Sequence, residues 1–309
     1  MKHGALFFGI LLFCIHCNLG EIPERPPILG IGSVTIATPS DTEGFYTTKL
    51  EITANGRFCA TACLAHAGLS AHQRLDLMNR AQVDPLTLKP TGSNLVQVTF
   101  ETSDIEALHG YLTSWGIQTS EIGGSDPDGA NPQFGITDPE GHSIGFIQFK
   151  GANPDISSKN RVSDRMIHAG FVVHDRAAMD KFYKDVLGFR LYWHGGMKDG
   201  TDDWVDMQVP EGTDWIEYML NVSPNADKRE LGVMNHIALG VPDIHEAEKQ
   251  LIKNGWMPGE KPEIGRDGKW QLNLYDPDGT RVELMEFTPV QKPCCSDYTG
   301  PHPGQKRPQ

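Results

Sequence analysis

The sequence predicts an α+β fold in which one small unit, a strand followed by a helix and about three strands, occurs four times. Short apolar, strand-like segments recur along the chain, and each is followed by apolar residues at helical spacing. Turn signals then separate further strand-like stretches. Two such units make a domain, so the repeats predict two domains of similar fold.

The four copies can be placed in order along the chain, and the first is the weakest. Glycine follows the last three helical patterns, as is common at the end of a helix. The strand and helix patterns cover residues 31–37 and 45–50, 95–100 and 105–115, 167–173 and 176–187, and 236–241 and 244–253.

Each half also contains a hairpin signal. Asp-Pro-Asp-Gly at 276–279 separates the strand-like residues 270–275 and 281–287, and Asp-Pro-Glu-Gly at 138–141 precedes residues 144–149. Proline at the second turn position and glycine at the fourth are typical of a type I turn. These turns predict that the last strands of each half pair with each other.

These patterns divide the chain into parts. We expect an N-terminal domain over residues 29–150 and a C-terminal domain over 165–289, joined by the polar residues 151–164. Residues 290–309 are rich in Pro, Gly and charge, which predicts a flexible tail. Residues 1–20 predict a signal peptide, because a short basic start precedes an apolar run too short to span a bilayer.

Export would place the mature protein in a secreted or periplasmic location, with lipidation at Cys17 as an alternative. Four cysteines would remain: Cys59, Cys63, Cys294 and Cys295. Their spacing does not match a zinc site, and adjacent cysteines seldom bridge each other. We expect thiols and at most a disulfide from the tail to the body of the protein.

The formal net charge of −13 argues against nucleic-acid binding, which needs clustered Lys and Arg. No apolar stretch is long enough for a membrane span. The predicted partner is therefore a small molecule, bound by a monomer or a homodimer.

Two histidines and two glutamates form a repeated pair in the C-terminal half. His168 and His236 stand in the first strands of the last two units, and Glu217 and Glu283 stand in strand-like segments at the ends of those units, at nearly equal spacing. Imidazole nitrogens and carboxylate oxygens are ligands for divalent metals. Four such residues at symmetric places predict one metal site shared between two units.

The motifs of this half resemble the vicinal oxygen chelate superfamily, which includes glyoxalase I, extradiol dioxygenases, methylmalonyl-CoA epimerase and the fosfomycin- and bleomycin-resistance proteins. F-Y-x-x-x-L-G-F begins at Phe182, H-I-A-L-G-V-P-D at His236 and D-P-D-G-x-x-V-E-L at Asp276. The resemblance implies two glyoxalase-like domains with cupped sheets. It also implies that the four His and Glu side chains hold a metal inside the C-terminal cup.

The N-terminal half lacks this set. Its corresponding places are Ser33, Leu95 and Gly145, with Asp76 as a candidate fourth. Because Leu95 and Gly145 cannot bind an ion, we expect this half to keep the fold without the metal.

The ligand set is most similar to that of glyoxalase I and implies nickel, zinc or cobalt. A bound ion could polarise a substrate carbonyl while a glutamate moves a proton on the adjacent carbon. Glu283 is the candidate base and Glu217 its counterpart, with Asn221 and Trp215 as candidate substrate contacts. The arginines that contact glutathione in the family are replaced by Val172 and Gly232, and these replacements argue against glutathione as the substrate.

Two alternatives remain. One is an extradiol-type dioxygenase with Fe(II) bound by His168, His236 and Glu283, for which Tyr275 stands in a place similar to that of a family tyrosine and His194 could be an acid–base group. The other is a non-catalytic small-molecule binder of the bleomycin-resistance type. The main prediction is an exported, metal-dependent lyase or isomerase.

Overall fold

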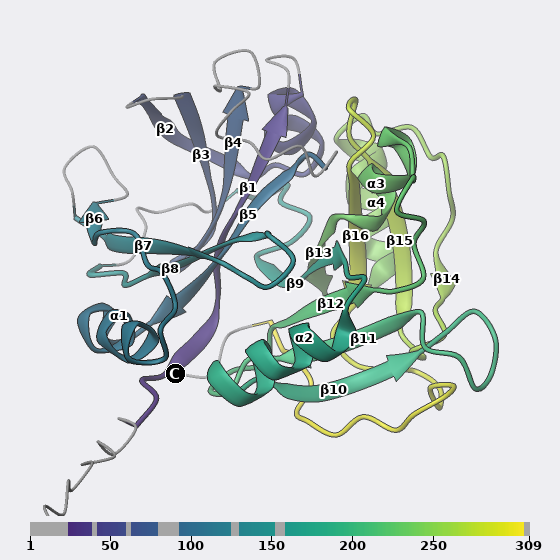
Figure 1. The fold of residues 1–309 in the computed structure, drawn as a ribbon. Helices are drawn as coiled ribbons and strands as arrows, with labels where there is room; N and C mark the ends of the chain where they lie inside the picture. The colour runs from purple at the N-terminus through teal and green to yellow at the C-terminus, as the bar shows by residue number, and fades with distance from the viewer. Residues whose placement is uncertain are drawn as a thin grey trace, which may run out of the picture.

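The computed structural model forms two sheets of eight strands, which lie beside each other in Figure 1. Both sheets are curled, so the predicted α+β fold with two cupped-sheet domains is confirmed. The predicted signal peptide lies outside the described residues. The structure describes residues 24–38, 42–59, 63–79, 93–124, 130–151 and 158–305.

The first sheet is built from the N-terminal half in the order β2-β3-β4-β1-β5-β8-β7-β6. Each unit contributes four neighbouring strands, and β1 pairs with β5 where the units meet. The strands are β1 (Ile28–Thr38), β2 (Thr53–Cys59), β3 (Cys63–Ser70), β4 (Gln73–Asn79), β5 (Leu95–Thr102), β6 (Gly123–Gly124), β7 (Pro132–Thr137) and β8 (Ser143–Ile147).

The second sheet repeats this topology in the order β10-β11-β12-β9-β13-β16-β15-β14. The central strands β12, β9, β13 and β16 are neighbours, and they are the strands that carry the four predicted metal ligands. The strands are β9 (Arg165–Val172), β10 (Arg190–Gly195), β11 (Trp204–Gln208), β12 (Trp215–Met219), β13 (His236–Val241), β14 (Glu263–Ile264), β15 (Trp270–Tyr275) and β16 (Arg281–Glu286).

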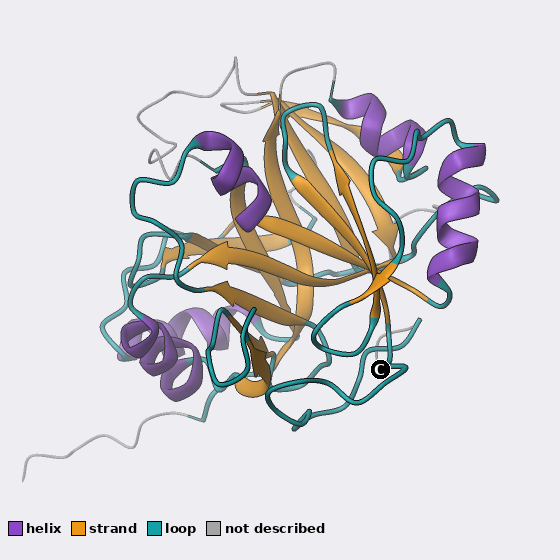
Figure 2. Cartoon of the chain, turned by 90° about the vertical axis from the view of Figure 1, so that its right-hand side faces the viewer, coloured by secondary structure: helices purple, strands orange, loops and turns teal. Residues whose placement is uncertain are grey.

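The helices lie at the outside of the strands (Figure 2). Aspartate caps several of them; Asp104 and Asp243, for example, accept backbone N–H groups in the first turns of α1 and α4. The helical segments are η1 (Phe45–Lys49), α1 (Ile105–Ser114), α2 (Arg176–Asp180), η3 (Lys181–Val186), α3 (Lys228–Met234) and α4 (Ile244–Lys253). None of the helices in the described part of the chain is long and apolar enough to cross a membrane.

The Phe-Tyr motif of each domain contacts the Asp-Pro-x-Gly turn of the other domain. The Tyr46 hydroxyl donates to the carboxylate of Asp276 at 2.9 Å, and the Tyr183 hydroxyl donates to Asp138 at 3.3 Å. In each case a tyrosine of a Phe-Tyr helix in one domain reaches the hairpin turn of the other. The largest apolar cluster also includes residues of both domains, so the domains share a core.

Residues 290–305, which we call the C-terminal strap, lie along the C-terminal domain. The backbone N–H groups of Val290 and Cys294 donate to the carbonyls of Gly268 and Arg266, at 2.9 and 2.8 Å. Farther along, strap groups bond to β9, β10 and β11: Thr299 N to Tyr192 O at 3.0 Å, Gln208 Nε2 to Pro301 O at 2.9 Å, and Arg165 Nη1 to Gly304 O at 2.5 Å.

These contacts differ from the flexible tail predicted for residues 290–309. The prediction rested on Pro, Gly and charge content, but the strap is held through backbone groups that composition does not reveal. The last residues, 306–309, lie outside the described part.

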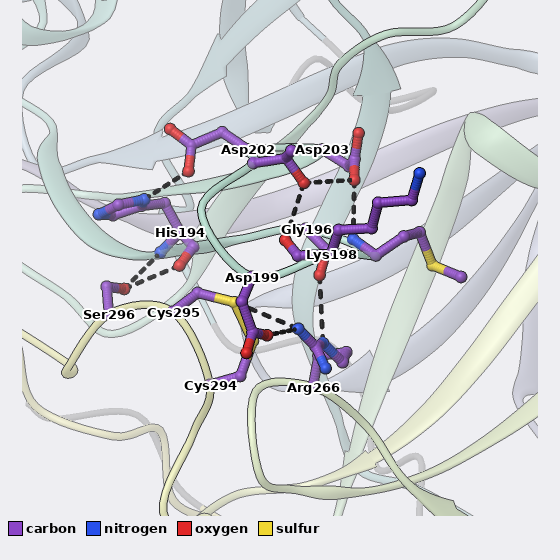
Figure 3. The surroundings of a disulfide bond; sticks show 12 residues. His194, Gly196, Lys198, Asp199, Asp202, Asp203, Arg266, Cys294, Cys295 and Ser296 are labelled. Carbon is purple, nitrogen blue, oxygen red and sulfur yellow. Dashed lines mark hydrogen bonds and ion pairs between the residues drawn. A yellow bond between two sulfur atoms is a disulfide. The ribbon is translucent and has the colours of Figure 1, made fainter.

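The strap also contains a disulfide between Cys294 and Cys295 (Figure 3). The expectation that adjacent cysteines do not bridge, with at most a bond from tail to body, is therefore wrong for this pair. Cys295 has a left-handed φ of 73°, an uncommon backbone conformation for a residue other than glycine. Its sulfur lies 3.7 Å from Nη2 of Arg266, whose guanidinium also pairs with Asp199.

Candidate metal centre

His168 and His236 project from the adjacent antiparallel strands β9 and β13 into the cup. Both side chains are fully buried, and their Nε2 atoms lie 3.1 Å apart. The His236 ring has room for this because residue 170, which pairs with His236 in the ladder, is glycine and has no Cβ atom where the ring lies. The structure therefore brings the two predicted histidine ligands together.

The two predicted glutamates flank this pair. Oε2 of Glu217 lies 3.2 Å from Nε2 of His236 and 4.0 Å from Nε2 of His168. Oε2 of Glu283 lies 3.5 Å from Nε2 of His168 and 3.8 Å from Nε2 of His236. His168, Glu217 and His236 each place a ligand atom within 4.8 Å of the other two, and Glu283 approaches both histidines from β16.

These distances fit a bound divalent ion. Ligand atoms about 2.1 Å from one ion lie about 3.0 Å apart when they are adjacent around an octahedral ion, and about 4.2 Å apart when they are opposite. The four donors also suit such an ion chemically, because two imidazoles and two carboxylates together carry two negative charges.

The protonation states of His236 and Glu283 suit metal binding. The Nδ1 atom of His236 lies 3.0 Å from the carbonyl oxygen of Met234, which can only accept, so Nε2 keeps its lone pair in the neutral ring. Burial and the charge of Arg281 lower the pKa of His236. Burial alone would raise the pKa of Glu283, but a hydrogen bond with His168 and the charge of Arg281 lower it to about 2.

Further charged side chains are buried around the cup. Burial raises the pKa of Asp206 well above its usual value, and its cross-strand partner Glu217 adds to this shift. Burial also raises the pKa of Asp267 to about 6 and lowers that of Lys269, whose Nζ lies 4.6 Å from the Trp215 ring. Uncompensated charge in such an interior is unfavourable, and a divalent cation would offset the excess of carboxylates.

We expect Gly170→Ala to displace a metal ligand. A Cβ atom at residue 170 would overlap the His236 ring, at only 2.5 Å from Nδ1. The imidazole must then move, so nickel affinity should fall about 10- to 100-fold, as for other changes that disturb ligand orientation. Calorimetric titration of the full-length variant with nickel would measure this loss.

Gly240→Ala is the matched control, because its Cβ would clash with Phe287 and with Ile167, 2.8 Å away, instead of with a ligand. Both variants should lose about 1–3 kcal/mol of stability through overpacking. Equal loss of nickel affinity in both variants would contradict the proposed positioning role of Gly170.

A pocket of about 90 Å³ opens beside the ligands. Pockets for drug-sized ligands are usually about 300–1,000 Å³, so this one suits a much smaller molecule. Trp193, Trp204, Trp215 and Met285 give apolar walls, and the polar lining consists of Asp206, Glu217, Arg266, Asp267, Gln271, Arg281 and Glu283.

One of the two predicted substrate contacts lines the pocket, and the other does not. Trp215 lines the pocket, and its ring lies 4.8 Å from that of His168. Asn221 does not line it; its amide donates to the Asp202 carbonyl at 2.9 Å and to the Asp203 carboxylate at 2.8 Å. The Asn221 side chain thus orders a neighbouring loop.

The two residues considered for a dioxygenase also lie outside the pocket lining. His194 is bound through Nδ1 to Asp202 at 2.7 Å. The Tyr275 hydroxyl donates to Glu260 at 2.9 Å.

The strand register of the N-terminal sheet corrects one of the positions that were predicted to correspond to the proposed metal ligands. In the C-terminal domain Gly170 pairs with both His236 and Glu217, and in the N-terminal domain Thr35 pairs with Gln97 and Asp76. The counterpart of His236 is therefore Gln97, two positions after the expected Leu95. Asp76 is ion-paired with Arg74 at 3.1 Å, and Gly145 offers no ligand atom.

Arg281, Asp206 and Lys269 are site residues that sequence reasoning did not assign. Arg281 could have been found by strand alternation, because it lies two residues before Glu283 and so shares its face. Asp206 is the one charged residue of the otherwise apolar or amide-bearing strand β11. Nothing local marks Lys269, which is buried by segments distant in the sequence.

Comparison with known proteins places this site in a family. Residues 165–284 match the model of the Glyoxalase/Bleomycin resistance protein/Dioxygenase superfamily. A probable chloroplastic lactoylglutathione lyase of Arabidopsis thaliana is 24% identical over 135 residues, which cover 42% of this chain and 38% of that protein. The lactoylglutathione lyase of Haemophilus influenzae is 27% identical over 124 residues, 40% of this chain and 92% of that protein.

Solved structures match over more of the chain. Homoprotocatechuate 2,3-dioxygenase from Arthrobacter globiformis aligns with a TM-score of 0.64 at 16% identity, covering 86% of this chain and 82% of its own. A substrate complex of the Brevibacterium fuscum enzyme gives 0.61 at 19% identity, covering 91% and 86%. Residues 165–284 thus belong to the glyoxalase, bleomycin resistance protein and dioxygenase superfamily, and the chain carries the fold of that superfamily in tandem.

Proposed function

We propose that this protein is a metal-dependent enzyme that moves a proton next to a carbonyl group of a small molecule. The observation that carries the proposal is the meeting of His168, Glu217, His236 and Glu283 from four neighbouring strands. A bound divalent ion would polarise a substrate carbonyl and so acidify the adjacent C–H bond. Nickel, zinc or cobalt suits these nitrogen and oxygen donors.

We assign the proton transfer to the two glutamates. Their low pKa values keep them ionised, and Oε2 of Glu283 can accept a proton from the substrate carbon. Glu217 approaches the histidines from β12, whereas Glu283 approaches them from β16, so the proton can be returned from another direction.

The pocket favours a substrate smaller than a glutathione adduct. A tripeptide conjugate needs a pocket of the usual several hundred Å³, well above the roughly 90 Å³ present here. The absent arginines at Val172 and Gly232 favour the same conclusion. Both lactoylglutathione lyases therefore support the type of reaction more than the identity of the substrate.

An extradiol-type reaction with Fe(II) is the second candidate, favoured by the tandem arrangement that the chain has in common with the two dioxygenases. Glu217 argues against it, because a second carboxylate stands beside the two histidines and Glu283. A non-catalytic binder is the third, and the intact ligand set argues against it.

Metal loading of the wild type and of Glu217→Ala tests these candidates. We expect nickel, zinc or cobalt in the wild type to support hydrogen–deuterium exchange of small α-hydroxycarbonyl compounds, followed by NMR in D₂O. Glu217→Ala should lower that exchange at least about 100-fold, the usual contribution of a positioned acid–base group.

Iron-dependent oxygen uptake on catechols that survives in Glu217→Ala would instead support the dioxygenase. Less than one metal ion per chain, with folding unchanged by chelators, would support the binder.

We also propose that the protein is exported. The basic and apolar pattern of residues 1–20 supports this location, and the Cys294–Cys295 disulfide is compatible with an oxidising compartment. Detection of the mature chain outside the cytoplasm, with a new N-terminus after residue 16, would test it.

A further inference from the structure

Arg281 stands directly at the metal centre. It lies on β16 two residues before Glu283, so both side chains project from the same face of the strand. It lines the pocket, and its Nη2 atom lies 2.7 Å from Nε2 of His236. The guanidinium therefore contacts the nitrogen that the proposed function assigns to the metal.

That contact and a metal bond exclude each other. Nδ1 of His236 donates its hydrogen to the Met234 carbonyl, so Nε2 of the neutral ring has one lone pair to offer. Arg281 can only donate hydrogen bonds, and it uses this lone pair. An ion bound at Nε2 leaves Nη2 of Arg281 without this acceptor.

No carboxylate of the described residues forms an ion pair with Arg281, and its Nε atom is buried without a hydrogen-bond partner. Arg266, the other arginine of the pocket, differs: it pairs with Asp199 and donates to the Gly196 carbonyl at 3.1 Å. A buried donor without an acceptor is unfavourable, so Arg281 needs a new partner when the ion occupies His236.

We propose that Arg281 binds a carboxylate group of the substrate beside the metal centre, and this inference rests on the proposed metal-dependent function. A guanidinium offers paired donors in a plane that matches the two oxygens of a carboxylate. The size of the pocket favours this compact anion over a bulkier acidic group. The substrate class is then a small carbonyl compound that also bears an acid group.

Two chelating probes that differ by one carboxylate test this assignment. Catechol offers neighbouring oxygens alone, and protocatechuate offers the same oxygens with a carboxylate on the ring. Binding to the nickel-loaded full-length protein is measured by calorimetry. We expect the wild type to prefer protocatechuate by at least about tenfold, and Arg281→Gln to lose most of that preference.

Arg266→Gln is the matched control, because Arg266 lines the same pocket but already has an acid partner; it should keep the preference. Arg281→Lys should keep a reduced preference, since it retains charge without the paired donors. Nickel affinity gives a second readout: Arg281→Gln should bind nickel more tightly than the wild type, because the competing donor at His236 is gone.

The outcomes separate this proposal from the proposed function. A wild type that binds nickel but does not distinguish the two probes overturns the role of Arg281 alone. The same holds if Arg281→Gln keeps the full preference or if Arg266→Gln loses as much. A wild type that binds no metal overturns both proposals together.

Discussion

Replacing His236 by alanine should abolish metal binding at the C-terminal cup. The variant removes the nitrogen that lies closest to both His168 and Glu217, at 3.1 and 3.2 Å. Changes that only disturb the orientation of a ligand lower metal affinity about 10- to 100-fold, so loss of the ligand itself should exceed about 100-fold. Nickel titration and metal analysis of the purified variant measure this effect.

His245→Ala serves as the control. This histidine belongs to the same domain but lies exposed on α4, where its ring contacts Trp270. It should bind metal like the wild type. Retention of one tightly bound ion by His236→Ala, or equal loss in both variants, would place the metal elsewhere.

The second large effect is expected at Asp214, a fully buried carboxylate in the loop before β12. It pairs with the buried Arg165 at 2.5 Å and accepts the backbone N–H of Ile31 on β1 at 3.0 Å. Asp214→Ala removes one charge of this buried ion pair, and breaking such a pair destabilises a protein by about 3–5 kcal/mol. The shift of the urea unfolding midpoint measures this loss.

Glu211 in the same loop provides the comparison, because its ion pair with Arg25 is partly exposed, with the two side chains 36% and 19% exposed. Glu211→Ala should change stability by less than about 1 kcal/mol. A paired replacement of Arg165 and Asp214 by apolar residues should recover much of the loss, since it removes both charges together. Similar midpoints for Asp214→Ala and Glu211→Ala would rule out the buried pair as a major source of stability.

Much of the fold could be predicted from local patterns. The repeated unit was visible because each copy places apolar residues with the period of its element, and both hairpin turns have Asp-Pro, an acidic residue and Gly in the same order. The sequence did not reveal why each half contains both a Phe-Tyr motif and an Asp-Pro-x-Gly turn. Tyr46 and Tyr183 meet the turn aspartates Asp276 and Asp138 across the domains, which requires the three-dimensional arrangement.

For the site, spacing and strand alternation predicted a cluster of His168, Glu217, His236 and Glu283, and the structure brings these four side chains together. Asn221 was selected because its place after Glu217 matches an asparagine that contacts glutathione in the resembled family, but its left-handed φ of 61° turns the chain into a loop. In the N-terminal half, β5 begins at Leu95, two residues before Gln97, whereas β13 begins at His236 itself, so Gln97 and not Leu95 is the counterpart of His236. Counting from the start of a strand-like stretch does not reveal this offset.

The C-terminal strap has a consequence for the order in which the protein matures. A chain that emerges from the ribosome or from a translocon exposes its N-terminal segments first. All four proposed metal ligands precede the strap in the sequence, and Glu283 is the last of them. The strands that carry these side chains thus emerge before the strap, and the contacts of Tyr298, His302 and Gly304 can form only afterwards. We expect a tag fused directly behind the strap to disturb this final step more than a tag at the N-terminus.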